Sequence, residues 1–143
     1  MHLESLGVRM ERHCANALKV AQWLSADPRI SWVSFPGLEE DKYHALAEKY
    51  MPNGTCGVIS FGVPGGREKV SAFLDHLKMV SIATHVADAR SCTLYPAGTT
   101  HRQLTEEQLV EAGVGIDLVR LSCGIENADD IITDLDQALA AVQ

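Results

Sequence analysis

The sequence predicts one domain of the α/β (α+β) class, in which helices cover a small sheet. Several segments carry apolar residues every three or four positions, which is typical of amphipathic helices. Between them lie short segments that alternate or are continuously apolar, as strands do. The resulting order, αβαβαββαβα, favours a small sheet that is open-faced or two-layered. A length of 143 residues suits a single domain over 1–143 with its own core.

Five elements are predicted in the first half of the chain. They are a helix over 6–26, a strand over 30–35, a helix over 39–50, a strand over 56–63 and a helix over 67–79. Ser5 can cap the first helix, and Asp27-Pro28 ends it. The strand over 56–63 is almost continuously apolar, as expected of a central strand buried on both faces or nearly so. The second helix has an apolar side made of Tyr43, Leu46, Ala47 and Tyr50.

The second half is predicted to complete the sheet. Strands are expected over 80–82, 91–94 and 117–125, with an irregular piece over 83–90 and a loop over 95–101. Thr105 and Gln108 form a capping box for a short helix that closes at Gly113. Asn127 caps the last helix. In the strand over 117–125, two sets of residues alternate, Leu118, Arg120 and Ser122 against Val119, Leu121 and Cys123.

The composition disfavours several classes of function. A net charge of −7 argues against broad attraction to nucleic acid or an anionic membrane. No apolar run approaches the roughly 18 residues needed to cross a bilayer, and the first residues do not resemble a signal peptide, so a cytoplasmic protein is expected. The cysteines and histidines lack the spacing of metal ligands, so no metal site is expected, and the four cysteines are interpreted as small buried apolar residues.

Two possible sites are weak when judged by their residues. The segment over 62–71, a strand end, a glycine turn and a helix start, lacks the phosphate-loop pattern and is interpreted as a plain strand-to-helix turn. Cys14 follows His13, but adjacent helix positions point in different directions and do not make a catalytic pair. The loop over 95–101 is richer in hydrogen-bonding groups than a connector needs, and its composition leaves functional and structural roles equally open.

Arg120 is the sharpest candidate. From residue 103 onward the chain carries nine acidic residues and one basic residue, Arg120, which lies among apolar neighbours on a predicted strand. An unpaired buried charge is costly, so the guanidinium must be paired or must face a cavity. It could form an internal salt bridge, or it could be reserved for the carboxylate or phosphate of a ligand. The residues alone leave both alternatives open.

Three ordered segments resemble one enzyme family. Arg9–His13, Tyr95–His101 and Asp117–Glu126 closely resemble the patterns R-M-E-R-H, H-P-A-S-T-T-H and R-L-S-V-G-I-E of the Cys/Met-metabolism family of pyridoxal-phosphate (PLP) enzymes. The resemblance implies the C-terminal domain of a fold-type I PLP enzyme, with a small, mainly antiparallel sheet and helices packed on one face.

The resemblance also implies a binding site for the substrate. Arg120 matches the family arginine that grips the α-carboxylate of the amino-acid substrate, and Thr99 would lie near the active-site entrance. His85 stands where a family Asn or Ser helps to frame the carboxylate site. The sequence departs from the family pattern at Tyr95, usually His, and at Ala87, usually Gly.

By resemblance, the chain is closest to O-acetylhomoserine sulfhydrylases, in which sulfide or a thiol replaces acetate at the γ carbon. PLP would act in the intact enzyme, on a large N-terminal domain absent from 1–143. No lysine here has the S-x-T-K context of the Schiff-base residue, so no catalytic or cofactor-binding residue is assigned and the chain alone is expected to be inactive. The alternatives are a methionine γ-lyase or cystathionine γ-synthase-like domain, or a non-catalytic module that pairs with itself or with a full-length homologue.

Overall fold

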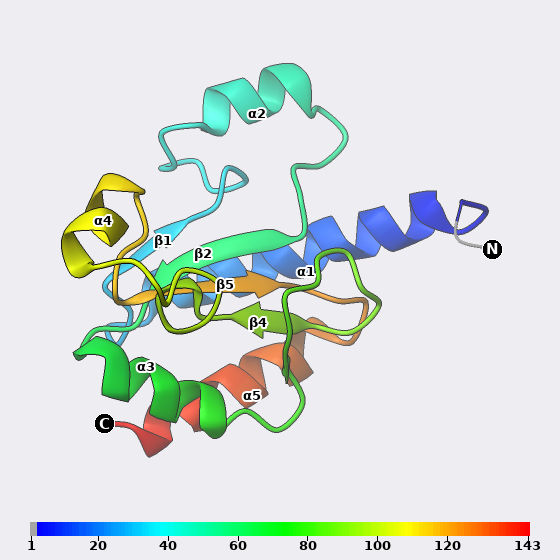
Figure 1. Ribbon diagram of the computed structural model, residues 1–143. Helices are drawn as coiled ribbons and strands as arrows, with labels where there is room; N and C mark the ends of the chain where they lie inside the picture. Colours follow the sequence, from blue (N-terminus) through cyan, green and yellow to red (C-terminus); the bar gives the residue numbers. More distant parts are fainter. Residues whose placement is uncertain (1–2) are drawn as a thin grey trace.

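A computed structural model describes residues 3–143, which form helices around one sheet (Figure 1). The helices are α1 (Leu6–Ala26), α2 (His44–Tyr50), α3 (Gly66–Asp75), α4 (Glu106–Glu111) and α5 (Ala128–Ala141), with a 3-10 helix η1 over Pro96–Gly98. The strands are β1 (Trp32–Ser34), β2 (Val58–Gly62), β3 (Ser81–Ile82), β4 (Cys92–Leu94) and β5 (Leu118–Ser122). The predicted order of elements is confirmed, and η1 is an addition within the expected loop over 95–101.

The sheet has the strand order β1-β2-β5-β4-β3. The β1–β2, β2–β5 and β5–β4 pairs are antiparallel, and β3 runs parallel to β4. The prediction of a small, mainly antiparallel sheet is therefore confirmed. The strand that carries Arg120, β5, lies in the middle, where hydrogen bonds on both sides hold its backbone rigidly.

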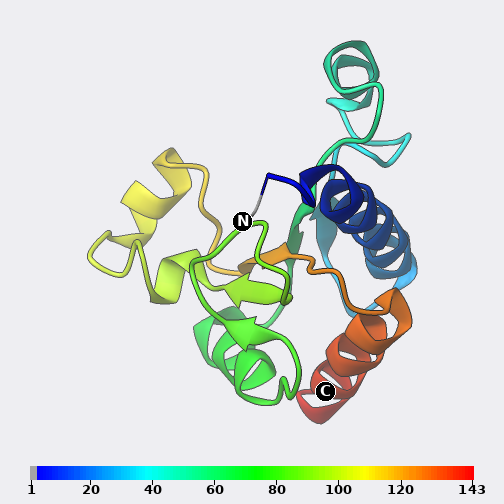
Figure 2. The same ribbon diagram turned by 90° about the vertical axis from the view of Figure 1, so that its right-hand side faces the viewer.

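One face of the sheet is apolar and carries the long helices. Ile59 and Phe61 of β2 and Val119 and Leu121 of β5 are completely buried on this face. They belong to one core with the apolar stripes of α1, α3 and α5. Figure 2 shows α1 and α5 side by side along it. Since each fully buried side chain of this size contributes about 1.5–3 kcal/mol, this face is the main source of stability.

The alternation of β5 is as predicted, and it separates two faces with different surroundings. Val119 and Leu121 point into the helical core, so Arg120 and Ser122 point to the opposite face. The helices α1, α3 and α5 all pack on this apolar face, which confirms the prediction of helices packed on one side of the sheet. The other face of β5 carries Arg120, which is half-buried, and Ser122, which is buried.

The helix caps are mostly as predicted. Thr105 and Gln108 form the capping box of α4, and Asn127 accepts a hydrogen bond from the backbone N–H of Asp129 at the start of α5. The prediction that Ser5 caps α1 is wrong. Ser5 precedes the helix, but its hydroxyl accepts a hydrogen bond from Arg9 Nε instead of a backbone N–H. Its backbone is not in the extended conformation that aims a capping side chain at the helix.

The second helix differs from its prediction in extent and surroundings. It begins at His44 and not near residue 39, because the Asp41 carboxylate accepts the backbone N–H groups of Phe35 and Tyr43 and forms a turn there. Its apolar side is largely in solvent, with Tyr43 51%, Leu46 52% and Tyr50 68% exposed. In Figure 1 α2 stands apart from the sheet. A cleft of about 440 Å³ separates it from α1.

A buried carboxylate fixes the segment between α3 and β3. Asp134 of α5 is buried, and it accepts hydrogen bonds from the backbone N–H groups of Lys78, Met79 and Val80 at 2.9 Å each. Burial acts to raise the pKa of Asp134, but the hydrogen bonds from these N–H groups and Gln137 outweigh it, and the pKa lies below its ordinary value. The contact ties the edge of the sheet to the last helix.

Candidate functional site

Arg120 lies in the middle of the sheet, on the face away from the long helices. Ser60 of β2 and Leu94 of β4 are its direct cross-strand neighbours. Its Nη2 donates a hydrogen bond of 3.0 Å to the main-chain carbonyl of Thr84. Within residues 3–143 no carboxylate forms an ion pair with it. The salt-bridge alternative is therefore wrong for the part of the chain described, and the guanidinium keeps its charge and several N–H donors for another group.

The connection from β3 to β4 lies next to Arg120. Its Thr84 carbonyl accepts from Arg120, and the backbone N–H of Ala87 donates to Ser122 Oγ at 3.1 Å. Ala87 has φ +55°, a left-handed conformation. The backbone thus keeps the shape that suits the glycine expected from the family pattern, although the residue is alanine.

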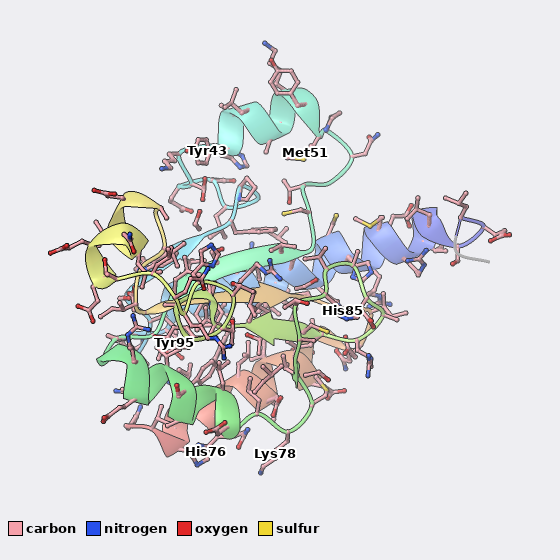
Figure 3. The ribbon with its side chains drawn as sticks, in the orientation of Figure 1. Tyr43, Met51, His76, Lys78, His85 and Tyr95 are labelled. Carbon is pink, nitrogen blue, oxygen red and sulfur yellow. The ribbon has the colours of Figure 1, made fainter. Side chains whose placement is uncertain are left out.

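His85 lies on this connection (Figure 3) and follows the residue that holds Arg120. Its side chain is exposed, and its Nδ1 is 3.6 Å from a carboxylate oxygen of Asp88. Hydrogen bonds from the backbone and side chain of Arg90 hold the pKa of Asp88 below its ordinary value. His85 is thus next in sequence to the Thr84 carbonyl that accepts from Arg120, while its imidazole lies near Asp88. Its role toward a substrate stays a prediction.

The loop over 95–101 is partly structural. Tyr95 (Figure 3) is buried, and its hydroxyl donates a hydrogen bond of 2.7 Å to the carbonyl of Ile116. Burial raises the pKa of Tyr95. Thr99, the second residue predicted near the substrate, donates its hydroxyl to the carbonyl of Tyr95 and so closes its own turn. Whether Thr99 also meets a ligand stays a prediction.

The first and third segments of the family resemblance, Arg9–His13 and Asp117–Glu126, meet in space. From α1, His13 Nδ1 lies 2.6 Å from the Cys123 carbonyl, and Asn16 donates to the carbonyls of Gly124 and Glu126. The Glu126 carboxylate accepts the backbone N–H and the hydroxyl of Ser91. These bonds fix the connection from β5 to α5 directly after the Arg120 strand. In the described part of the chain, His13 Nε2 is buried without a hydrogen-bond partner.

The weaker candidates remain weak. Gly65 and Gly66 both have positive φ and form a strand-to-helix turn, as interpreted from the sequence. Cys92 and Cys123 are buried as predicted, whereas Cys14 and Cys56 are only half-buried and Cys14 lines the cleft beside α2.

Residues 3–143 contain no group of three metal-ligating side chains placed to hold an ion. Over the same residues, no helix has the length and apolar character to cross a bilayer.

Comparison with known proteins gives one consistent result. The family profile described as "Cys/Met metabolism PLP-dependent enzyme" matches residues 2–140. An O-acetyl-L-homoserine sulfhydrylase of Leptospira meyeri is 48% identical over 138 residues, which are 96% of this chain and 31% of the relative. A homocysteine synthase of Schizosaccharomyces pombe is 47% identical, over 96% of this chain and 32% of its own.

A solved structure shows the same fold. It is a Campylobacter jejuni protein described as an O-acetylhomoserine (thiol)-lyase, solved with pyridoxyl-lysine monophosphate. Its TM-score is 0.89 and its identity 41%, over 96% of this chain and 33% of the solved chain. The chain therefore spans about a third of the length of the relatives that it matches.

Proposed function

Since the chain belongs to the Cys/Met-metabolism family of PLP-dependent enzymes, we propose that it serves as the C-terminal, substrate-carboxylate-binding domain of an O-acetylhomoserine sulfhydrylase-like enzyme. In the intact enzyme, sulfide or a thiol would replace the acetate of an O-acetylhomoserine-like substrate, in the cytoplasmic biosynthesis of methionine and cysteine. The relatives named as sulfhydrylases and homocysteine synthases support this reaction over elimination by a γ-lyase.

One observation carries the proposal: the half-buried Arg120 guanidinium, on a rigid central strand, donates to a neutral carbonyl and not to a carboxylate. A guanidinium offers two parallel N–H groups that fit the two oxygens of a carboxylate. Because Thr84 accepts from one Nη2 hydrogen only, donors remain for such a pair. Hydrogen bonds to charged groups contribute about 1.5–3 kcal/mol, enough for roughly 10- to 100-fold in substrate affinity.

His85 and Thr99 would complete the substrate side of the site. His85 is close in sequence to the carbonyl that holds Arg120, and its imidazole is exposed. Thr99 lies at the end of η1, where its hydroxyl is bound to Tyr95 but its residue is exposed. Their positions make both candidates for orienting a substrate that Arg120 has bound.

The lysines of this chain do not fit covalent attachment of PLP. Lys19 pairs with Asp129 at 2.7 Å, and Lys42 and Lys49 lie over the rings of the tyrosines that follow them. Lys69 belongs to α3 on the helical side, and Lys78 lies in the turn after it (Figure 3). None of these elements is the strand or loop around Arg120. We therefore assign the cofactor to the remainder of the full-length enzyme.

A second candidate is a non-catalytic interaction module. The exposed apolar side of α2, with Tyr43, Leu46 and Tyr50, favours contact with another polypeptide surface. Size-exclusion chromatography with light scattering tests self-association of the 143-residue chain. A monomer that also fails to bind a full-length homologue would remove this candidate.

The main proposal is tested by Arg120→Lys in the full-length enzyme. Lysine keeps the charge but loses the paired donors, so we expect KM for the amino-acid substrate to rise about 10-fold or more with PLP content unchanged. Arg29→Lys is the matched control, because Arg29 pairs with Asp27 and with Asp136 of α5 on the helical side. Equal kinetics of the Arg120 variant and the wild type would reject the proposal.

A further inference from the structure

The connection from β3 to β4 is attached to β5 at two points. Arg120 donates to the carbonyl of Thr84 across 3.0 Å, and the backbone N–H of Ala87 donates to Ser122 Oγ across 3.1 Å. Arg120 and Ser122 are two residues apart on one strand, so their side chains lie on the same face. The two hydrogen bonds form a brace that joins residues 84–87 to the strand.

Ser122 is the rigid end of this brace. The residue is only 2% exposed and lies on the central strand, with Val58 and Cys92 as its cross-strand partners. Water has little access to its hydroxyl and therefore competes weakly with the Ala87 N–H for this oxygen.

Ala87 makes the brace necessary. A residue with a Cβ is disfavoured in the left-handed conformation, and Ala87 has φ +55°. Ala87 is exposed, so core packing does not hold it in place. The backbone is also tied at Ala83, which donates to Thr93, and at Ala89, which accepts from Ile125. Between these points the bond to Ser122 stabilises the conformation of Ala87, and this conformation affects where the Thr84 carbonyl lies.

We infer that Ser122 is a positioning residue for Arg120: through Ala87 and Thr84 it holds the guanidinium in one orientation toward the substrate carboxylate. The inference rests on the proposed role of Arg120. Ser122 acts through this connection and not through contact with the substrate. Its hydroxyl limits the motion of residues 84–87, and the Thr84 carbonyl in turn limits the motion of the Arg120 side chain.

The first test measures the brace in the 143-residue chain. Amide hydrogen exchange of Ala87 and rotation about the Nε–Cζ bond of Arg120 are measured by NMR in the wild type and in Ser122→Ala. We expect both to become at least about fivefold faster in the variant. Ser122→Thr keeps the oxygen and is expected to restore slow exchange. Unchanged exchange, or faster exchange with unchanged Arg120 rotation, would overturn the inference.

Ser60→Ala is the matched control. Ser60 lies directly opposite Arg120 on β2 and is the same type of residue, but it has no hydrogen bond to the 84–87 segment. Its substitution is expected to leave Ala87 exchange and Arg120 rotation unchanged. An equal effect of both variants would show a general loosening of the sheet and would also overturn the inference.

The second test connects the brace to binding. In the full-length enzyme, Ser122→Ala is expected to raise KM for the amino-acid substrate about three- to tenfold, with kcat within twofold and PLP content unchanged. If Arg120→Lys raises KM but Ser122→Ala does not, the inference fails and the proposed function stands. A different outcome is that Ser122→Ala speeds Ala87 exchange while Arg120→Lys leaves KM unchanged. The two hydrogen bonds of the brace would then be real, but the proposed function would have failed, and the inference that rests on it would fail too.

Discussion

Arg120 and Thr84 are joined by a hydrogen bond whose acceptor is a neutral main-chain carbonyl, at 3.0 Å. A carboxylate partner would have neutralised the arginine and made it a structural residue. A carbonyl orients the guanidinium and leaves its charge intact. This is the difference between an arginine that closes a salt bridge and one that is available to an anionic group of a ligand.

Asp134 is expected to be a major source of acid sensitivity. Asp134→Asn removes a carboxylate that accepts three backbone N–H groups, and we expect a loss of about 1–3 kcal/mol in the free energy of unfolding at pH 7. The pKa of Asp134 is lowered by folding, so its contribution is fully present above the ordinary value of 3.8. It is lost as pH falls through the lower, folded-state pKa.

Urea unfolding of the wild type and Asp134→Asn between pH 7 and pH 3 checks this. The difference between the two proteins should shrink at the acid end of the range. Asp75→Asn, at an exposed acid at the end of α3, serves as control and should change stability little. A difference between wild type and Asp134→Asn that is constant across the whole range would contradict the assignment.

Ala87→Gly is expected to stabilise the protein. Glycine adopts the left-handed conformation without the steric cost that alanine has at φ +55°, and we expect a gain of up to about 1 kcal/mol. Thermal unfolding measures the change. Ala89→Gly is the matched control, since Ala89 is also exposed but has no positive φ. It should be neutral or destabilising, and a gain at Ala89 equal to that at Ala87 would count against this explanation.

The four cysteines are expected to differ in reactivity. Burial raises the pKa of Cys123 to about 12, and burial also raises the pKa of Cys92. Burial and the neighbouring Cys56 raise the pKa of Cys14, but Cys14 lines the open cleft. Iodoacetamide at pH 8, followed by peptide mass spectrometry, should label Cys14 and Cys56 well before Cys92 and Cys123. Early labelling of Cys123 in the folded protein would contradict the burial of this thiol.

Local chemistry explains the parts of the fold that the sequence predicts correctly. The caps at Thr105 and Asn127 depend on residues within three positions of each other. The two faces of β5 follow from strand alternation alone. The start of α2 does not follow from local pattern, because the Asp41 side chain accepts backbone N–H groups on both sides of it and delays the helix to His44. The apolar side of α2 predicts a helix but does not show which surface, if any, packs against that side.

The candidate site divides in the same way. Arg120 is conspicuous in sequence as a lone base in an acidic segment, and the resemblance to a family gives it a role. Its partner could not be predicted, since Thr84 is 36 residues away and acts through a main-chain atom. Asn16 and Ser122 were missed for the same reason. The one available signal for Asn16 was a polar residue three positions after His13, on the face of α1 that turns toward the sheet.

The central claim, that Arg120 binds a carboxylate, is tested most directly by comparing two ligands of the full-length enzyme. These are homoserine and its amide, in which a neutral carboxamide replaces the α-carboxylate. The wild type should bind the acid about 10- to 100-fold more tightly than the amide. In Arg120→Gln this ratio should fall close to one, because binding of the acid weakens and binding of the amide changes little. A ratio in Arg120→Gln as large as in the wild type would show that another group recognises the carboxylate.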